Sequence, residues 1–94
     1  MNKYESVIII NPNTNEEGIE DLIQKITDLI NKDGKVTSVE NLGKKRLAYE
    51  ISKCKEGYYV IFYYETESNI IVEIERNFRI TEEIIKFITV RNND

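Results

Sequence analysis

The stretch YYVIFYY, residues 58–64, is apolar or aromatic at every position. Successive side chains of a strand point to opposite faces, so a run without a polar position is typical of a strand inside a sheet. A second run of this kind, VIII at residues 7–10, is ended by the turn sequence Asn11-Pro12-Asn13. The two runs predict two central strands.

Two other stretches repeat apolar residues every three or four positions, as amphipathic helices do. The first helix is expected to start with a capping box formed by Thr14 and Glu17 and to end at Gly34 as a C-cap. Its apolar stripe consists of Ile19, Leu22, Ile23, Ile26, Leu29 and Ile30. The second helix is expected to open at Thr66 or Ser68, with a stripe of Ile70, Ile71, Ile74 and Phe78.

Two more strands are predicted, one from Lys35 to about Ser52 and one over residues 84–90. In the first of them the apolar positions change phase, which requires an extra residue, and Gly43 is the natural place for a bulge. A turn is expected over residues 53–57. Both strands mix polar with apolar residues, which favours the edges of a sheet.

The resulting order is β-α-β-β-α-β, which predicts an α+β fold of the ferredoxin-like type. We expect a four-stranded antiparallel sheet in the order 2-3-1-4, with both helices on one face. A single domain is expected over residues 1–94, with residues 92–94 frayed. The helix-free face, lined by Tyr and Ile, is either a surface for a partner or a set of tyrosines lying between core and water.

The charge is unevenly distributed along the chain. The 94 residues carry 13 Lys and Arg against 17 Asp and Glu, a net charge of −4. Residues 35–55 hold six basic and two acidic residues, a local net charge of +4, whereas the remainder holds seven basic and fifteen acidic ones. An acidic chain does not bind polyanions by overall charge, so any such site must be local.

The composition argues against catalysis. The chain has no His, no glycine-rich phosphate loop and no nucleophile beside a base, so neither an enzyme nor a cofactor nor a metal site is predicted. Cys54, between Lys53 and Lys55, is either a reactive thiol or an ordinary turn residue, and a lone cysteine suits a reducing compartment. The start of the sequence has neither a signal peptide nor a membrane span, which favours a cytoplasmic location.

Lys44, Lys45 and Arg46 form the densest basic run, on a predicted edge strand. They either protect that edge against strand pairing or contact the backbone phosphates of a nucleic acid. Further candidates for phosphate contact are Lys3, Arg91, Lys86 and Arg79, although a helix C-terminus or surface solvation also accounts for the last two. The aromatic residues of 58–64 invite comparison with RNA-recognition motifs, but Gly57 and Tyr58 do not fit that motif, and packing is the favoured role.

The segment from Gly43 to Ile51, GKKRLAYEI, resembles the signature of the bacterial small-subunit ribosomal protein S six family. Tyr4-Glu5, Asn11-Pro12-Asn13 and Gly57-Tyr58 extend the resemblance over nearly the whole chain. It implies a structural component of the small ribosomal subunit that binds the central domain of 16S ribosomal RNA as a heterodimer with ribosomal protein S eighteen. On this interpretation residues 47–49 anchor the strand, and the cations before them face RNA.

Two other functions share this topology. One is a homodimeric regulatory domain that senses a small molecule, although Asn11-Pro12-Asn13 offers no glycine where a ligand would approach the backbone. The other is an acyl-phosphate hydrolase, which would need an Arg and an Asn converging on a phosphate. For the ribosomal function, the uncovered sheet face or an edge strand is the expected surface for the basic partner.

Overall fold

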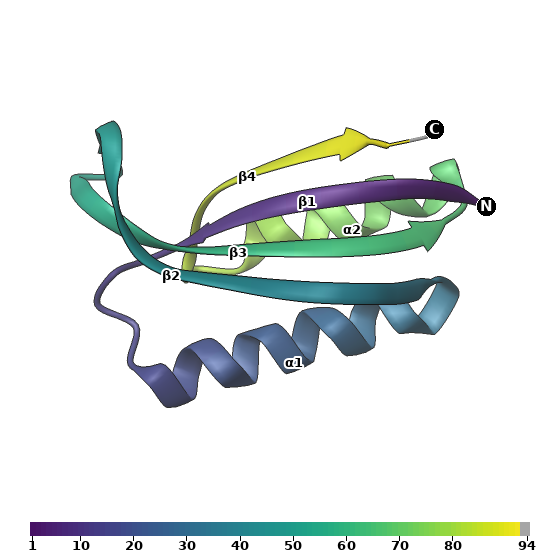
Figure 1. The fold of residues 1–94 in the computed structure, drawn as a ribbon, viewed down its shortest axis with the longest axis horizontal. Helices are drawn as coiled ribbons and strands as arrows, with labels where there is room; N and C mark the ends of the chain where they lie inside the picture. Colours follow the sequence, from purple (N-terminus) through teal and green to yellow (C-terminus); the bar gives the residue numbers. More distant parts are fainter. Residues whose placement is uncertain (93–94) are drawn as a thin grey trace.

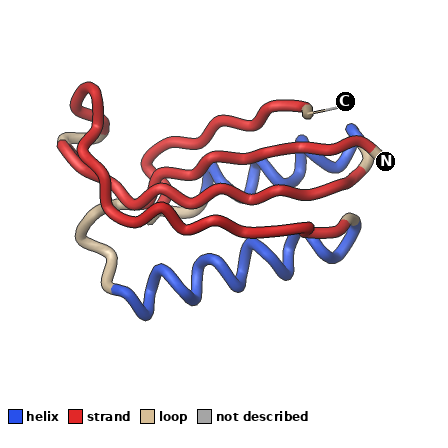
Figure 2. The backbone as a smooth tube through the Cα atoms, in the orientation of Figure 1, coloured by secondary structure: helices blue, strands red, loops and turns tan. Residues whose placement is uncertain are grey.

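The computed structural model describes residues 1–92, and the sheet and its two helices are shown in Figures 1 and 2. The elements follow the chain as β1 (Asn2–Ile10), α1 (Glu16–Asp33), β2 (Lys35–Ile51), β3 (Cys54–Thr66), α2 (Ser68–Ile80) and β4 (Ile84–Arg91). The four strands pair antiparallel in the order β2-β3-β1-β4. The predicted order, with the two apolar strands in the centre, is therefore confirmed.

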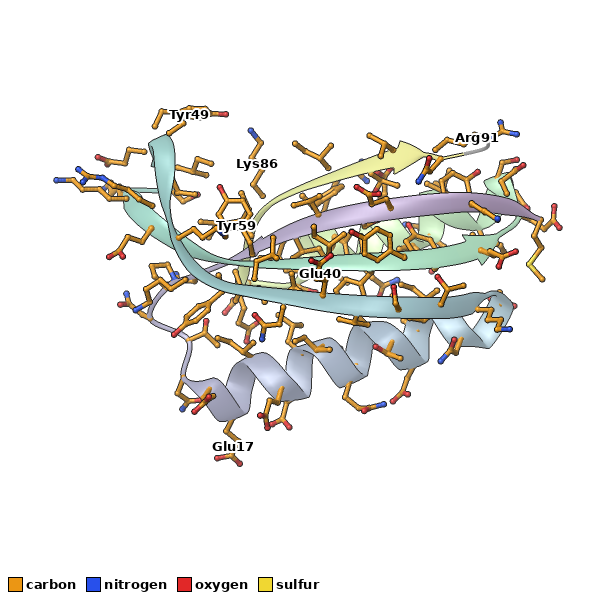
Figure 3. All side chains as sticks on the ribbon, in the orientation of Figure 1. Glu17, Glu40, Tyr49, Tyr59, Lys86 and Arg91 are labelled. Atoms are coloured by element: carbon orange, nitrogen blue, oxygen red, sulfur yellow. The ribbon has the colours of Figure 1, made fainter. Side chains whose placement is uncertain are left out.

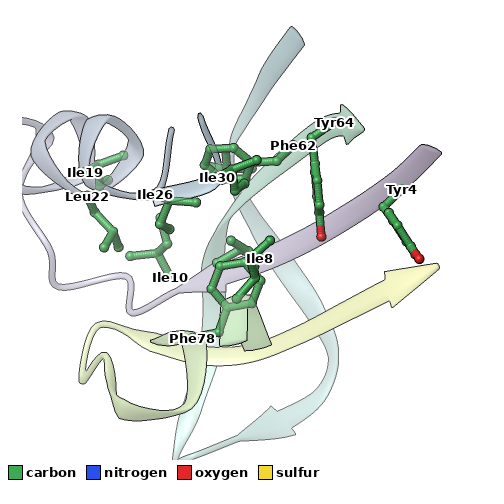
Figure 4. Close-up of a cluster of buried hydrophobic side chains, with 12 residues drawn as sticks. Tyr4, Ile8, Ile10, Ile19, Leu22, Ile26, Ile30, Phe62, Tyr64 and Phe78 are labelled. Atoms are coloured by element: carbon green, nitrogen blue, oxygen red, sulfur yellow. The ribbon is translucent and has the colours of Figure 1, made fainter. Parts of the chain in front are cut away.

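The core lies between the sheet and the two helices, because one face of β1 and β3 is packed against both (Figure 4). The register places Ile8 opposite Val60 on that face, and both side chains are fully buried. From α1 the buried residues are Ile19, Leu22, Ile26 and Ile30, and from α2 they are Ile74 and Phe78. Both predicted helix stripes therefore point into the sheet.

Three hydroxyl groups cross the inner face of the sheet. The Ser6 Oγ lies 2.8 Å from the Tyr64 hydroxyl and 2.7 Å from the Thr89 Oγ1, within hydrogen-bonding distance of both. Burial raises the pKa of the Tyr64 hydroxyl, while the hydrogen bonds to Ser6 and Thr89 act in the opposite direction. This row joins β3, β1 and β4 and leaves no buried polar side-chain atom without a partner among residues 1–92.

The helix ends agree in part with the sequence-based expectation, and the predicted C-cap of α1 at Gly34 is confirmed. The predicted capping box of Thr14 and Glu17 is wrong, because the N-cap is Asn15, whose Oδ1 accepts the N–H of Gly18 at 2.7 Å. Asparagine is among the strongest N-cap residues, so it outcompetes the threonine before it. Of the two predicted starts for the second helix, Ser68 is confirmed, since Thr66 ends β3 and donates its hydroxyl to the Asp33 carbonyl at 3.2 Å.

The long strand β2 pairs irregularly with β3. The predicted bulge at Gly43 is confirmed by a register shift between Asn41 and Gly43 and by a φ of 79° at the glycine. The predicted turn over residues 53–57 is wrong, because β3 already starts at Cys54. The chain reverses instead at Ser52 and Lys53, whose φ angles are 49° and 64°. Pairing between Ile51 and Cys54 leaves only these two residues for the turn.

At the other end of the sheet, Asn92 donates its N–H to the Lys3 carbonyl at 2.7 Å. The rest of the predicted frayed end, residues 93–94, lies outside the described residues. No helix within residues 1–92 is both long enough and apolar enough to span a membrane.

Candidate nucleic-acid and protein interface

The end of the β2–β3 hairpin, residues 44–55, projects past the ends of β1 and β4 and bends toward the β4 side of the sheet (Figure 1). Its two strands are unequal. Arg46 is paired with Glu56 and Ile51 with Cys54, so the four residues 47–50 lie opposite Lys55 alone. This excess length bends β2 into an arch, as bulged strands do. The basic run and the Leu-Ala-Tyr sequence therefore belong to one hairpin end.

Five cations and one carboxylate occupy the hairpin end. The cations are Lys44, Lys45, Arg46, Lys53 and Lys55, and all five are exposed. The Lys44 ammonium lies 5.4 Å from the centre of the Tyr58 ring, a cation–π contact. Within residues 1–92 the ion pairs join the N-terminal ammonium to Glu67 and Arg76 to Glu73, so none of them involves a hairpin cation.

The arch attaches to the sheet through one apolar residue and one polar contact. Leu47 is buried, with 8% of its surface exposed, whereas Tyr49 is 60% exposed. The Tyr49 hydroxyl accepts a hydrogen bond from Lys86 Nζ at 2.6 Å, and the same nitrogen lies 5.2 Å from the ring centre (Figure 3). Of the predicted anchor at residues 47–49, only Leu47 is buried, because the residues of an arch cannot all face the sheet.

The other candidate cations lie apart from the basic run. Lys86 reaches the hairpin end through Tyr49. Lys3 and Arg91 lie at the opposite end of β1 and β4, where Arg91 Nη2 donates to Asn2 Oδ1 at 2.8 Å. Arg79, at the end of α2, lies 5.6 Å from the centre of the Phe87 ring on the helix side. The structure therefore places Lys44, Lys45 and Arg46 on the hairpin end, brings Lys86 into contact with Tyr49 of the same hairpin, and leaves the other three elsewhere.

The sheet face opposite the helices, called here the open face, is apolar over much of its area. It is formed by Val7 and Ile9 of β1, Tyr59 and Ile61 of β3, and Ile88 and Val90 of β4. Ile88 and Val90 are 51% and 48% exposed. Beneath the arch, a pocket of about 170 Å³ is lined by residues that include Ile9, Leu47, Tyr49, Tyr59 and Ile88. The hairpin end thus covers one end of the open face and leaves the rest accessible.

Carboxylates lie beside this apolar surface. The Tyr63 hydroxyl, which is on the open face, donates a hydrogen bond to Glu40 Oε1 at 2.9 Å. That hydrogen bond raises the pKa of Tyr63, and desolvation and the charges of Glu40 and Glu5 raise it further. Two carboxylates therefore create a negative potential around Tyr63, at a distance from the basic hairpin end.

Sequence reasoning missed part of this surface. Lys53 and Lys55 contribute to the local positive charge but are not among the predicted contacts, because the sequence predicts a turn over residues 53–57. Glu5 and Glu40 are far apart in sequence and meet only through the pairing of β1 and β2 with β3. No group of three or more carboxylate or thiol side chains in residues 1–92 has the arrangement of a metal site.

Known proteins are similar to this chain in sequence and in architecture. The sequence profile described as Ribosomal protein S6 matches residues 3–91. The small ribosomal subunit protein bS6 of Clostridium acetobutylicum is 41% identical over 91 residues, which cover 96% of each chain. The same protein of Alkaliphilus oremlandii is 38% identical over 91 residues, covering 97% of each.

A solved structure of a family member has the same architecture as this chain. The crystal structure of 30S ribosomal protein S6 from Thermotoga maritima matches with a TM-score of 0.93 and 38% identity, over 97% of this chain and 87% of the other. Proteins of this family are structural components of the cytoplasmic ribosome, not enzymes. The chain therefore belongs to the ribosomal protein S6 family and is a protein of the small ribosomal subunit.

Proposed function

We propose that this chain binds the central domain of 16S ribosomal RNA through its hairpin end, as a heterodimer with ribosomal protein S eighteen. The observation that carries the proposal is the density of exposed cations on residues 44–55, none of them in an ion pair with a described carboxylate. Cations neutralised by neighbouring carboxylates would release few counterions on binding RNA, whereas these remain available for phosphates. The hairpin also holds Lys44, Lys45 and Arg46 on a paired strand, which limits the ordering cost.

Lys44, Lys45 and Arg46 are the proposed primary contacts to phosphate. Lys86 is close enough to extend this surface, because its ammonium already reaches the arch at Tyr49. Lys3 and Arg91 would contact a separate part of the RNA, from the opposite end of the sheet. Arg79 is the remaining candidate, and its position beside Phe87 on the helix side supports a packing role as well.

The open face is the proposed surface for the partner protein. Its apolar residues and the pocket under the arch suit an aliphatic side chain from the partner, since a stable interface needs a buried apolar centre. The negative potential of Glu5 and Glu40 around Tyr63 suits a basic protein. The same charge would repel RNA phosphates, so the two ligands would use separate surfaces. This division accounts for an acidic protein in an RNA-binding assembly.

The RNA contact is tested by titrating the protein–partner pair onto central-domain 16S RNA at several salt concentrations. The test variant carries Lys44→Gln, Lys45→Gln and Arg46→Gln. Removal of one phosphate contact should reduce the steepness of the fall of log K with log salt by about 0.7–0.9. A matched control removes three exposed cations from the helix side, with Lys25→Gln, Lys32→Gln and Arg76→Gln. The control should leave slope and affinity close to wild type.

Unchanged binding by the hairpin variant, with the heterodimer still formed, would mean that these cations only protect a sheet edge. Equal binding of RNA by the wild-type protein without its partner would contradict the division of roles.

The partner surface is tested separately with Ile88→Asp, which places a charge in the open face. A matched control is Val72→Asp on α2, where the side chain is 62% exposed. Ile88→Asp should abolish the heterodimer, and a heterodimer of normal affinity would refute this placement.

A further inference from the structure

The turn of the basic hairpin uses residues that its backbone does not favour. Ser52 and Lys53 both have positive φ, as the central residues of a two-residue type I′ turn do. Asn-Gly and Asp-Gly are preferred in this turn, because side chains with a Cβ crowd the backbone at positive φ. Within residues 1–92 these are the non-glycine residues with positive φ. Backbone strain of this kind concentrates at functional sites.

The charge of the turn is a second, independent feature. Lys53 is exposed and forms no ion pair with a carboxylate of the described chain. The arch at residues 47–50 contacts Lys86 through Tyr49, and the turn joins the arch to β3 through the Ile51–Cys54 pair. Lys55 follows on β3, opposite the arch, so the turn continues the basic surface of Lys44, Lys45 and Arg46 onto the second strand.

We infer that the Ser52–Lys53 turn is itself an RNA-binding site, in which the Lys53 ammonium contacts a backbone phosphate and Lys55 supports it from β3. This inference rests on the proposed RNA contact of the hairpin end and extends it to the tip. It explains why the turn carries a lysine where glycine would relieve the backbone. Stability is reduced at the position where the cation is needed.

The inference predicts opposite effects of one substitution on folding and on binding. Lys53→Gly removes a strained side chain and a cation together. The melting temperature should rise by a few degrees, because the relief of strain exceeds the flexibility that glycine adds to the unfolded chain. RNA binding by the protein–partner pair should weaken several-fold, and its salt slope should fall by about 0.7–0.9.

The neighbouring residue provides a matched control. Ser52→Gly relieves strain at the other position of the same turn without changing the charge. It should raise the melting temperature in the same way and leave affinity and salt slope unchanged. Lys53→Arg, which keeps the charge and the strain, should retain both the wild-type stability and the wild-type slope.

The outcomes separate this inference from the proposed function. Normal RNA binding by Lys53→Gly, with loss of binding by the Gln variant of residues 44–46, would overturn the inference and leave the proposed function standing. Normal binding by both variants would overturn both. A fall in melting temperature for Lys53→Gly would refute the strain argument on which the inference depends.

Discussion

Replacing Gly34 by alanine should destabilise the protein strongly, for a reason that its sequence position does not reveal. The glycine follows α1 but has a φ of −154°, which is extended backbone open to any residue. A Cβ built at this position would lie 2.5 Å from the Glu65 carbonyl oxygen and 2.8 Å from the Thr66 Cβ. Glycine is therefore needed because β3 passes too close for a side chain.

The size of the effect follows from these distances. Real Cβ atoms keep at least 3.0 Å from other heavy atoms, so the chain at Gly34 and β3 must separate by about 0.5 Å. Overpacking of this kind costs about 1–3 kcal/mol. The hydrogen bond from the Thr66 hydroxyl to the Asp33 carbonyl spans the same interface, and breaking it adds about 0.5–1.5 kcal/mol. The free energy of unfolding should fall by roughly 2–4 kcal/mol.

Urea denaturation of three variants tests this reasoning. Gly34→Ala should shift the midpoint to lower urea with an unchanged m-value. Gly18→Ala is the control, because its Cβ would meet only side-chain atoms at 3.1 Å and alanine favours the helix. Gly34→Asn separates two explanations. Asparagine would rescue a left-handed C-cap, but a steric clash would persist. An unchanged midpoint for Gly34→Ala, or rescue by asparagine, would refute the account.

Ile30→Ala should lower the free energy of unfolding by about 2–5 kcal/mol, because its side chain is fully buried, and a decrease below about 0.5 kcal/mol in urea denaturation would mean that the stripe of α1 is misassigned. Tyr64→Phe should make stability less sensitive to alkaline pH. The raised pKa of the Tyr64 hydroxyl favours its neutral form in the folded state. The contribution of this shift to the free energy of unfolding is complete below pH about 10 and falls above that pH, where the tyrosine of the unfolded chain loses its proton. Equal alkaline destabilisation of the two proteins, measured by thermal unfolding from about pH 8 to 11, would contradict this.

The strand order could be predicted because it depends on a coarse property. A central strand is covered by neighbours on both edges and is mostly apolar, which the runs at residues 7–10 and 58–64 show directly. The first helix was also placed well, since its apolar stripe repeats over several turns. Its N-terminus is harder to predict, because Thr14 and Asn15 are both capable N-caps and only the chain geometry selects between them.

The functional surface was less predictable, because it depends on local detail. The basic run at 44–46 is visible as charge alone. The two-residue turn is hard to predict because Ser52-Lys53 lacks the usual Asn-Gly signal. For the same reason Lys53 is not among the predicted RNA contacts. The arch depends on a register shift between the pairs Arg46–Glu56 and Ile51–Cys54. The spacing of apolar residues in the sequence does not predict this shift.

The central claim is that the hairpin end faces RNA in the assembled subunit, and a tethered cleavage probe tests it most directly. Glu50 in the arch and Glu20 on the outer side of α1 are both exposed glutamates. Each is changed to cysteine in a Cys54→Ser background, labelled with an iron chelate that generates hydroxyl radicals, and assembled with the partner and 16S RNA. We predict strand cleavage in the central domain from position 50 and none above background from position 20. Cleavage from position 20 with none from position 50 would contradict the account.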